Sequence, residues 1–162
     1  MLRTLLKQLS LVSSVAEPHA VREHERGHLY LAVAVLLHEA TRVDLKESPK
    51  ELAASKQAIA ELFGLPPQEC EAIVIEGREK AKGITSYFAT VSVIRREFSL
   101  HERVSLIEHI WRVAYADSHL DYYEDHFVRK IAHLLHVPNT QTILARNRAR
   151  SNETGKSRGA RQ

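Results

Sequence analysis

Apolar residues recur every three or four positions along most of this chain, the spacing of a helix that buries one face. No segment alternates apolar and polar residues for long enough to indicate a strand. The pattern predicts an all-α protein, a compact bundle of about seven helices. Four of the predicted helices span residues 2–15, 19–43, 49–63 and 67–81, and three more carry the apolar residues within 87–94, 106–114 and 127–135.

The middle of the second predicted helix is apolar on nearly every side. An inner stripe runs from Leu29 to Ala40, and Leu31, Ala34 and Val35 add apolar side chains around the rest of the helix. A helix without a polar face has to be covered by other elements in all directions. We therefore expect this helix at the centre of the bundle.

One pattern occurs twice in the chain. A long apolar helix leads to Asp44, and Glu51 opens the next helix seven residues later; Asp117 and Glu124 repeat this arrangement. Internal similarity of this kind indicates a duplicated unit. We predict two pseudo-symmetric helix–loop–helix halves whose acidic loops face each other. The second helices of the two halves also end alike, in Phe63-Gly64-Leu65-Pro66 and Leu135-His136-Val137-Pro138.

The formal net charge of +3 is unevenly distributed. Residues 146–162 contain six basic residues, one acidic residue and no apolar periodicity, which predicts a basic disordered tail. Such a tail can contact nucleic acid or an anionic membrane through phosphate groups, or simply remain solvated. Residues 1–18 are expected to form an amphipathic N-terminal helix, which leaves residues 19–145 as the folded domain.

Two further features bear on where the protein works. Cys70 is the only cysteine, so the chain forms no intramolecular disulfide, as is usual in a reducing compartment. No run approaches the roughly 18 apolar residues of a membrane-spanning helix. We therefore expect a cytoplasmic protein.

The two acidic segments carry a family resemblance. The motifs are Trp111–Asp117 with Leu120–Glu124, and Leu36–Asp44 in the first half. With them the chain resembles the TerB-like family, which is named for bacterial tellurite resistance. The resemblance implies a helical bundle with pseudo-twofold symmetry over residues 19–145, a divalent-metal site at the acidic loops, and a relation to the N-terminal domain of a membrane-anchored DnaJ-like co-chaperone.

The chain departs from the family pattern in its loops. The glycine that usually follows the aspartate is replaced by Leu45 and Ser118, and Lys46 puts a positive charge in the first loop. Neither loop has the alternating oxygen ligands of an EF-hand, so a metal would have to be shared between the loops. The candidate ligands are Asp44, Glu51, Asp117, Asp121 and Glu124, which as hard oxygen donors favour calcium or magnesium.

These acidic residues also have a purely structural interpretation. Glu51 and Glu124 each lie three residues after a capping residue, where a carboxylate can accept from a free backbone amide. Asp121 is itself a suitable helix cap. Asp44 and Asp117 lie at the ends of helices, where the macrodipole disfavours negative charge, so each calls for a nearby cation. A metal and a basic side chain such as Arg112 both meet that need.

A second motif has the letters of a zinc-protease site. His24-Glu25-Arg26-Gly27-His28 places two histidines one turn apart on a helix, with a glutamate between them. Gly27 weakens the helix, and no third ligand follows at an obvious position.

We therefore expect a non-enzymatic domain that binds a divalent cation at paired acidic loops in a stress response of the tellurite-resistance type. The first alternative is a protein-interaction module, with an unknown protein partner or a homodimer, whose acidic loops are only structural. The second is a zinc hydrolase that uses the His24–His28 motif.

Overall fold

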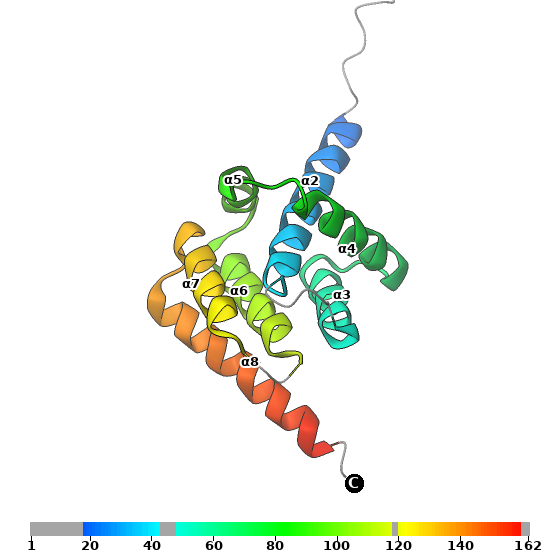
Figure 1. The fold of residues 1–162 in the computed structure, drawn as a ribbon. Coiled ribbons are helices and arrows are strands. Elements are labelled where there is room, and N and C mark those ends of the chain that lie inside the picture. The colour runs from blue at the N-terminus through cyan, green and yellow to red at the C-terminus, as the bar shows by residue number, and fades with distance from the viewer. Residues whose placement is uncertain (1–17, 43–47, 118–119, 160–162) are drawn as a thin grey trace, which may run out of the picture.

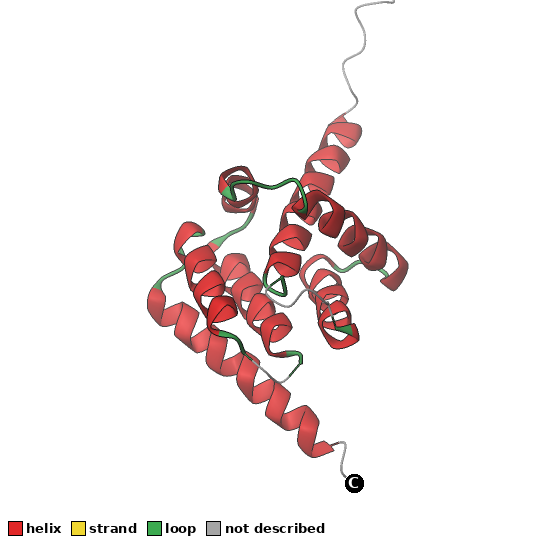
Figure 2. Ribbon diagram, viewed as in Figure 1, coloured by secondary structure: helices red, strands yellow, loops and turns green. Residues whose placement is uncertain are grey.

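The computed structural model describes residues 18–42, 48–117 and 120–159 of the chain. Within these ranges it contains seven helices and no strand, so the predicted all-α class is confirmed (Figure 2). The helix predicted over residues 2–15 lies outside the described residues. The helices are α2 (Pro18–Glu39), α3 (Pro49–Phe63), α4 (Pro67–Ala81), α5 (Phe88–Glu97), α6 (Leu100–Tyr115), α7 (Tyr122–Leu134) and α8 (Asn139–Gly159).

Helix α2 lies at the centre of the bundle, as its apolar composition predicts. Val33, Val35 and Leu36 are fully buried. Helices α4 and α5 pack on different sides of α2, α3 packs between α4 and α6, and α7 and α8 cover α6 (Figure 1). No helix in the described ranges is both long enough and apolar enough to cross a membrane.

Close packing of α2 against α4 depends on one glycine. A Cβ atom placed on Gly77 would lie 2.4 Å from the Cβ of Ala34, closer than two non-bonded carbon atoms can approach. The glycine therefore lets the two helix backbones meet directly at this point. The sequence alone gives no sign of this contact.

Three helices begin with a capping box, which satisfies amide groups that the helix itself leaves unpaired. In α3, Ser48 N donates to Glu51 Oε2 at 2.7 Å, and Glu51 N donates to Ser48 Oγ at 3.2 Å. In α7, Asp121 N donates to Glu124 Oε2 at 3.1 Å. Helix α6 begins in the same way as α3, with Ser99 and Glu102.

The two helix ends that look alike in the sequence also share a backbone conformation. Gly64 after α3 has φ 66°, and His136 after α7 has φ 54°. Both residues are in the left-handed region, which ends a helix and turns the chain away. The two halves therefore correspond locally at their helix starts and ends, while an overall pseudo-twofold symmetry remains a prediction.

The prediction of a disordered tail from residue 146 is wrong for residues 146–159. They continue α8, which runs unbroken across the expected domain boundary. Ala145 and Ala149, one turn apart, are fully buried against α6, and Arg146 lies 5.2 Å over the ring of Trp111. The arginines look solvated in the sequence because their partners are on another helix. The predicted and observed numbers of helices therefore agree partly by coincidence. The seven observed helices include α8, which was not predicted, while the predicted helix over residues 2–15 lies outside the described residues.

Candidate functional site

Two glutamates at helix starts are buried carboxylates. Glu51 at the start of α3 and Glu124 at the start of α7 are each only 1% exposed. Each uses its Oε2 atom to accept a hydrogen bond from the backbone amide of the capping residue. The predicted capping role is thus confirmed for both. Capping does not by itself require burial, because the equivalent Glu102 at the start of α6 is exposed.

Acidic residues from both halves of the chain influence the pKa of Glu124. Burial raises the pKa of Glu124 to about 7, although the hydrogen bond from the Asp121 amide opposes this shift. The negative charges of Asp117, Glu51 and Asp121 raise the pKa of Glu124 further. The structure therefore brings three of the other four predicted ligands within electrostatic range of Glu124. Asp44, the fifth, lies outside the described residues.

One carboxylate oxygen in this region lacks a hydrogen-bond partner among the described residues. Glu51 Oε1 and Ser55 Oγ lie one turn apart on α3, and both are buried atoms with no hydrogen-bond partner in the described part of the chain. Buried polar atoms normally have a partner, and leaving one without costs about 1–3 kcal/mol. Carboxylate and hydroxyl oxygens suit calcium or magnesium, so the donor chemistry fits a hard cation.

The site is not assembled as a finished metal centre among the described residues. Within residues 18–42, 48–117 and 120–159, no three histidine, cysteine or acidic side chains are grouped to hold an ion. Asp121 is exposed, and its Oδ1 accepts from the Tyr123 amide at 2.8 Å. Completing a coordination shell would therefore require additional oxygens, such as that of Asp44 or solvent.

The His24–His28 motif forms a pair without a third ligand. The two rings lie 4.4 Å apart between centroids on an exposed stretch of α2. His38 is ten residues beyond His28, about 15 Å along the helix axis. A catalytic zinc site needs three protein ligands. The described residues supply only two here.

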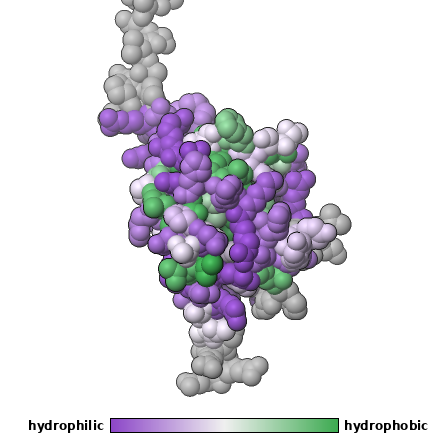
Figure 3. Space-filling model, turned by 90° about the vertical axis from the view of Figure 1, so that its left-hand side faces the viewer, coloured by the Kyte–Doolittle hydropathy of each residue, from purple (hydrophilic) through white to green (hydrophobic). Residues whose placement is uncertain are grey.

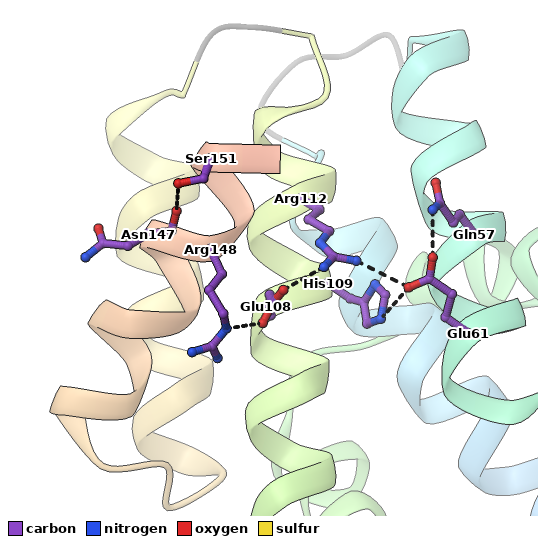
Figure 4. Close-up of polar contacts among 8 residues, drawn as sticks. All are labelled: Gln57, Glu61, Glu108, His109, Arg112, Asn147, Arg148 and Ser151. Carbon is purple, nitrogen blue, oxygen red and sulfur yellow. Dashed lines mark hydrogen bonds and ion pairs between the residues drawn. The ribbon is translucent and has the colours of Figure 1, made fainter. Parts of the chain in front are cut away.

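A polar network that sequence analysis missed joins α3, α6 and α8 (Figure 4). Glu61 Oε2 lies 3.4 Å from His109 Nε2 and 3.2 Å from Arg112 Nη1. Glu108 then bridges Arg112 and Arg148, each at 2.6 Å. Burial, followed by the charge of Arg112, lowers the pKa of His109. Only the Glu108–Arg112 pair has a sequence signal, its spacing of four residues on one helix.

Another buried carboxylate, Glu39, anchors the end of α2. It is 7% exposed, accepts from Tyr87 Oη at 2.5 Å and pairs with Arg42 at 3.1 Å. Burial raises the pKa of Tyr87, and the bond to Glu39 adds to this effect, so the phenol stays a donor. This contact connects α2 to the residue that precedes α5. Its partners are 48 positions apart, which is why periodicity could not reveal it.

Comparison with known proteins gives one result for this chain. The family model described as tellurite resistance protein TerB matches residues 30–147. The matched segment begins within α2 and ends within α8, so it includes Glu51, Glu124 and all three capping boxes. No curated protein and no solved structure matches the chain.

Proposed function

This chain belongs to the tellurite resistance protein TerB family, and we propose that it is a non-enzymatic domain that binds a divalent cation between the starts of α3 and α7. The observation that supports the proposal most is the burial of both Glu51 and Glu124, with the charge of Glu51 acting on Glu124. Membership of this family supports the further proposal that the domain acts in a stress response of the tellurite-resistance type.

Burying a charged carboxylate has a free-energy cost. A carboxylate taken out of water without a cation loses several kcal/mol of hydration. The raised pKa of Glu124 expresses that cost, because the site favours the neutral acid. A divalent cation would supply the missing positive charge and hold both carboxylates ionised. Glu51 and Glu124 are the proposed core ligands, and Asp117, Asp121 and Asp44 are further candidates that would complete the site.

The experiment is a calorimetric titration of the chelator-stripped full chain with calcium and magnesium. Glu51→Gln and Glu124→Gln each remove one carboxylate while keeping an oxygen that can accept the capping bond. Glu102→Gln is the matched control, because Glu102 makes the same 2.7 Å capping bond in α6 without burial. We expect saturable binding by the wild type and the control, and at least about tenfold weaker binding by the other two variants.

Protons should compete with the cation for Glu124. Its pKa of about 7 means that a proton must leave before the carboxylate can bind a metal. Affinity should therefore be higher at pH 8 than at pH 6, and binding should release protons. Equal affinity at both pH values would contradict a role for Glu124 as a ligand.

A second function, that of a protein-interaction module, is favoured by the capping contacts. Glu51 and Glu124 both complete capping boxes, and the described residues contain no group of three ligands. In that case the acidic loops would be structural, and neither calcium nor magnesium would bind or raise the melting temperature. Zinc bound only at residues 24–28 would instead support a hydrolase.

A further inference from the structure

Helices α5 and α7 border a hollow of about 420 Å³ with an apolar interior. Val91 is buried, and Tyr87 and Leu134 are half-buried, so these side chains supply apolar surface along the hollow. Phe88 stands at the edge with 79% of its surface exposed. A single exposed apolar side chain is common on a protein surface, but this ring borders the hollow and adds to its apolar surface.

A second hollow of about 490 Å³ continues the first past the end of α5. The two share Ser92, Arg95 and His136, so they form one groove. We call it the α5–α7 groove. Leu100, another large apolar residue that is 44% exposed, lines its far end. Each end of the groove therefore offers an exposed apolar residue.

The lining of the α5–α7 groove carries charge of one sign. Arg95, Arg96, Arg103 and Lys130 line it, and Arg96 is paired with Glu97 at 2.7 Å. Among the described residues that line the groove there is no aspartate or glutamate, although the chain has 20 acidic residues. Arg103 is held in place because its Nη1 donates to the Leu135 carbonyl oxygen. Clustered cations on a concave surface raise the local concentration of anions.

We propose that the α5–α7 groove docks an acidic segment of a partner protein that also carries an aromatic or aliphatic anchor. Charge complementarity selects the acidic residues, and the apolar interior accepts the anchor. The side of the molecule that bears α5 and α7 is mainly hydrophilic with hydrophobic patches between, which matches a mixed ligand of this kind (Figure 3). The proposal does not rest on cation binding by the acidic residues.

The geometry favours a peptide over the other polyanions. Single-stranded nucleic acid is usually held by several aromatic rings on which successive bases stack. Of the Phe and Tyr rings that line the groove, only Phe88 is open, because the Tyr87 ring contacts Lys130 at 5.8 Å and Phe127, so a strand would find one such ring to stack on. A flat bilayer would meet basic residues that protrude, whereas these line a hollow. A peptide of a few residues fits a groove with an anchor position at each end.

The test begins with selection of random dodecapeptides, displayed on phage, against the full chain. We expect enriched peptides to be net acidic with at least one aromatic or aliphatic residue. A fluorescein-labelled synthetic copy of the most enriched peptide should bind more weakly as salt is raised. It should shift amide resonances of residues 85–96 and 130–136. Enriched peptides without acidic excess, an absence of enrichment, or shifts elsewhere would overturn the proposal.

Matched variants then locate the binding. Arg95→Glu combined with Lys130→Glu should weaken binding at least about tenfold. Arg150→Glu and Lys50→Glu together make the same charge change at exposed positions outside the groove, and should leave affinity within about twofold. Phe88→Ala, at a position too exposed to affect folding, should weaken binding without changing charge. Equal losses in the groove and control variants would contradict the assignment.

Two further probes separate the partner classes. A dodecathymidylate strand and phosphatidylserine vesicles should bind no better to the wild type than to the variant with both groove substitutions. If either competes with the peptide at the same residues and binds more tightly, the groove serves that polyanion and the proposal fails.

Discussion

At the scale of single residues, the most informative group is a carboxylate that the fold keeps close to neutral. Glu124 is 1% exposed, and burial together with three acidic neighbours raises its pKa to about 7 from an ordinary value near 4.5. The capping bond to Asp121 N accounts for its position but not for its burial. A residue with this combination makes the stability of the domain depend on pH.

The direction of that dependence follows from proton binding. Between pH 4.5 and 7 the folded state holds a proton on Glu124 that the unfolded state releases. The contribution of Glu124 to the unfolding free energy is therefore complete below pH 4.5 and is lost as the pH rises through 7. In chelator, we expect wild-type stability to fall by up to about 3 kcal/mol from this group between pH 4.5 and 8.

Glu124→Gln should remove that fall, since an amide does not titrate. The variant should be more stable than the wild type at pH 8, and this difference should shrink towards pH 4.5. Urea unfolding at several pH values measures the effect, and Glu102→Gln should retain the wild-type slope. Parallel curves for wild type and Glu124→Gln would show that the carboxylate is not held neutral.

A second prediction at this scale concerns His136. It has φ 54°, a conformation that costs a non-glycine residue roughly 1–2 kcal/mol. His136→Gly should therefore stabilise the domain by about 1 kcal/mol, measured by urea unfolding. Gly64→Ala, at the equivalent helix end with φ 66°, should destabilise it by a similar amount. A loss of stability in His136→Gly would mean that contacts of the imidazole stabilise the folded state by more than the left-handed backbone conformation destabilises it.

At the scale of elements, α2 organises the packing because every side of its middle is apolar. Among the glycines of the described residues, Gly77 comes closest to a neighbouring helix. A Cβ atom placed on Gly77 in α4 would lie only 2.4 Å from Ala34 Cβ in α2. The contact combines two small residues that are more than 40 positions apart in the sequence. It lets the backbones of the two helices approach each other directly.

Gly77→Ala should force α2 and α4 apart. The expected loss is about 1–3 kcal/mol, because overpacking outweighs the better helix propensity of alanine. Gly27→Ala is the matched control within α2, where, beyond the nearby backbone of the helix itself, no atom of the described residues lies within 4 Å of the added methyl. That variant should gain about 0.5–1 kcal/mol. Thermal unfolding of both variants checks the prediction, and a stabilised Gly77→Ala would contradict the close contact.

At the scale of the whole molecule, α8 is an integral part of the fold. Its arginines meet partners on α6 and α7: Arg148 pairs with Glu108 at 2.6 Å, and Arg146 lies 3.3 Å from Asp125 Oδ1. The Glu61–Arg112–Glu108 network extends the connection to α3 (Figure 4). Individual exposed ion pairs contribute little, so the buried alanines of α8 supply most of the attachment.

Placing a charge beneath α8 tests this attachment. Ala149 is fully buried, so Ala149→Glu should cost at least about 2 kcal/mol or detach the helix. Arg150→Glu, at the adjacent exposed position, should change stability by no more than about 0.5 kcal/mol. Hydrogen exchange across residues 139–155 would report detachment directly. Equal behaviour of the two variants would restore the interpretation of a disordered tail.

The sequence by itself determined the features that depend on near neighbours. Helical periodicity fixed the helix class and the central place of α2, while the spacing of Ser48 and Glu51, or of Asp121 and Glu124, located helix starts. The resemblance to TerB rested on the same local motifs, and the family match confirms it. All of these signals act over a few residues, where chain geometry leaves few alternatives.

Tertiary structure decided whatever depends on residues far apart in the chain. It buried Glu51 and Glu124, paired Glu39 with Tyr87, and made a helix of residues that look solvated. It also assembled the α5–α7 groove from three helices. The energy of a charged side chain is set by its burial and by its neighbours in space, and periodicity contains neither.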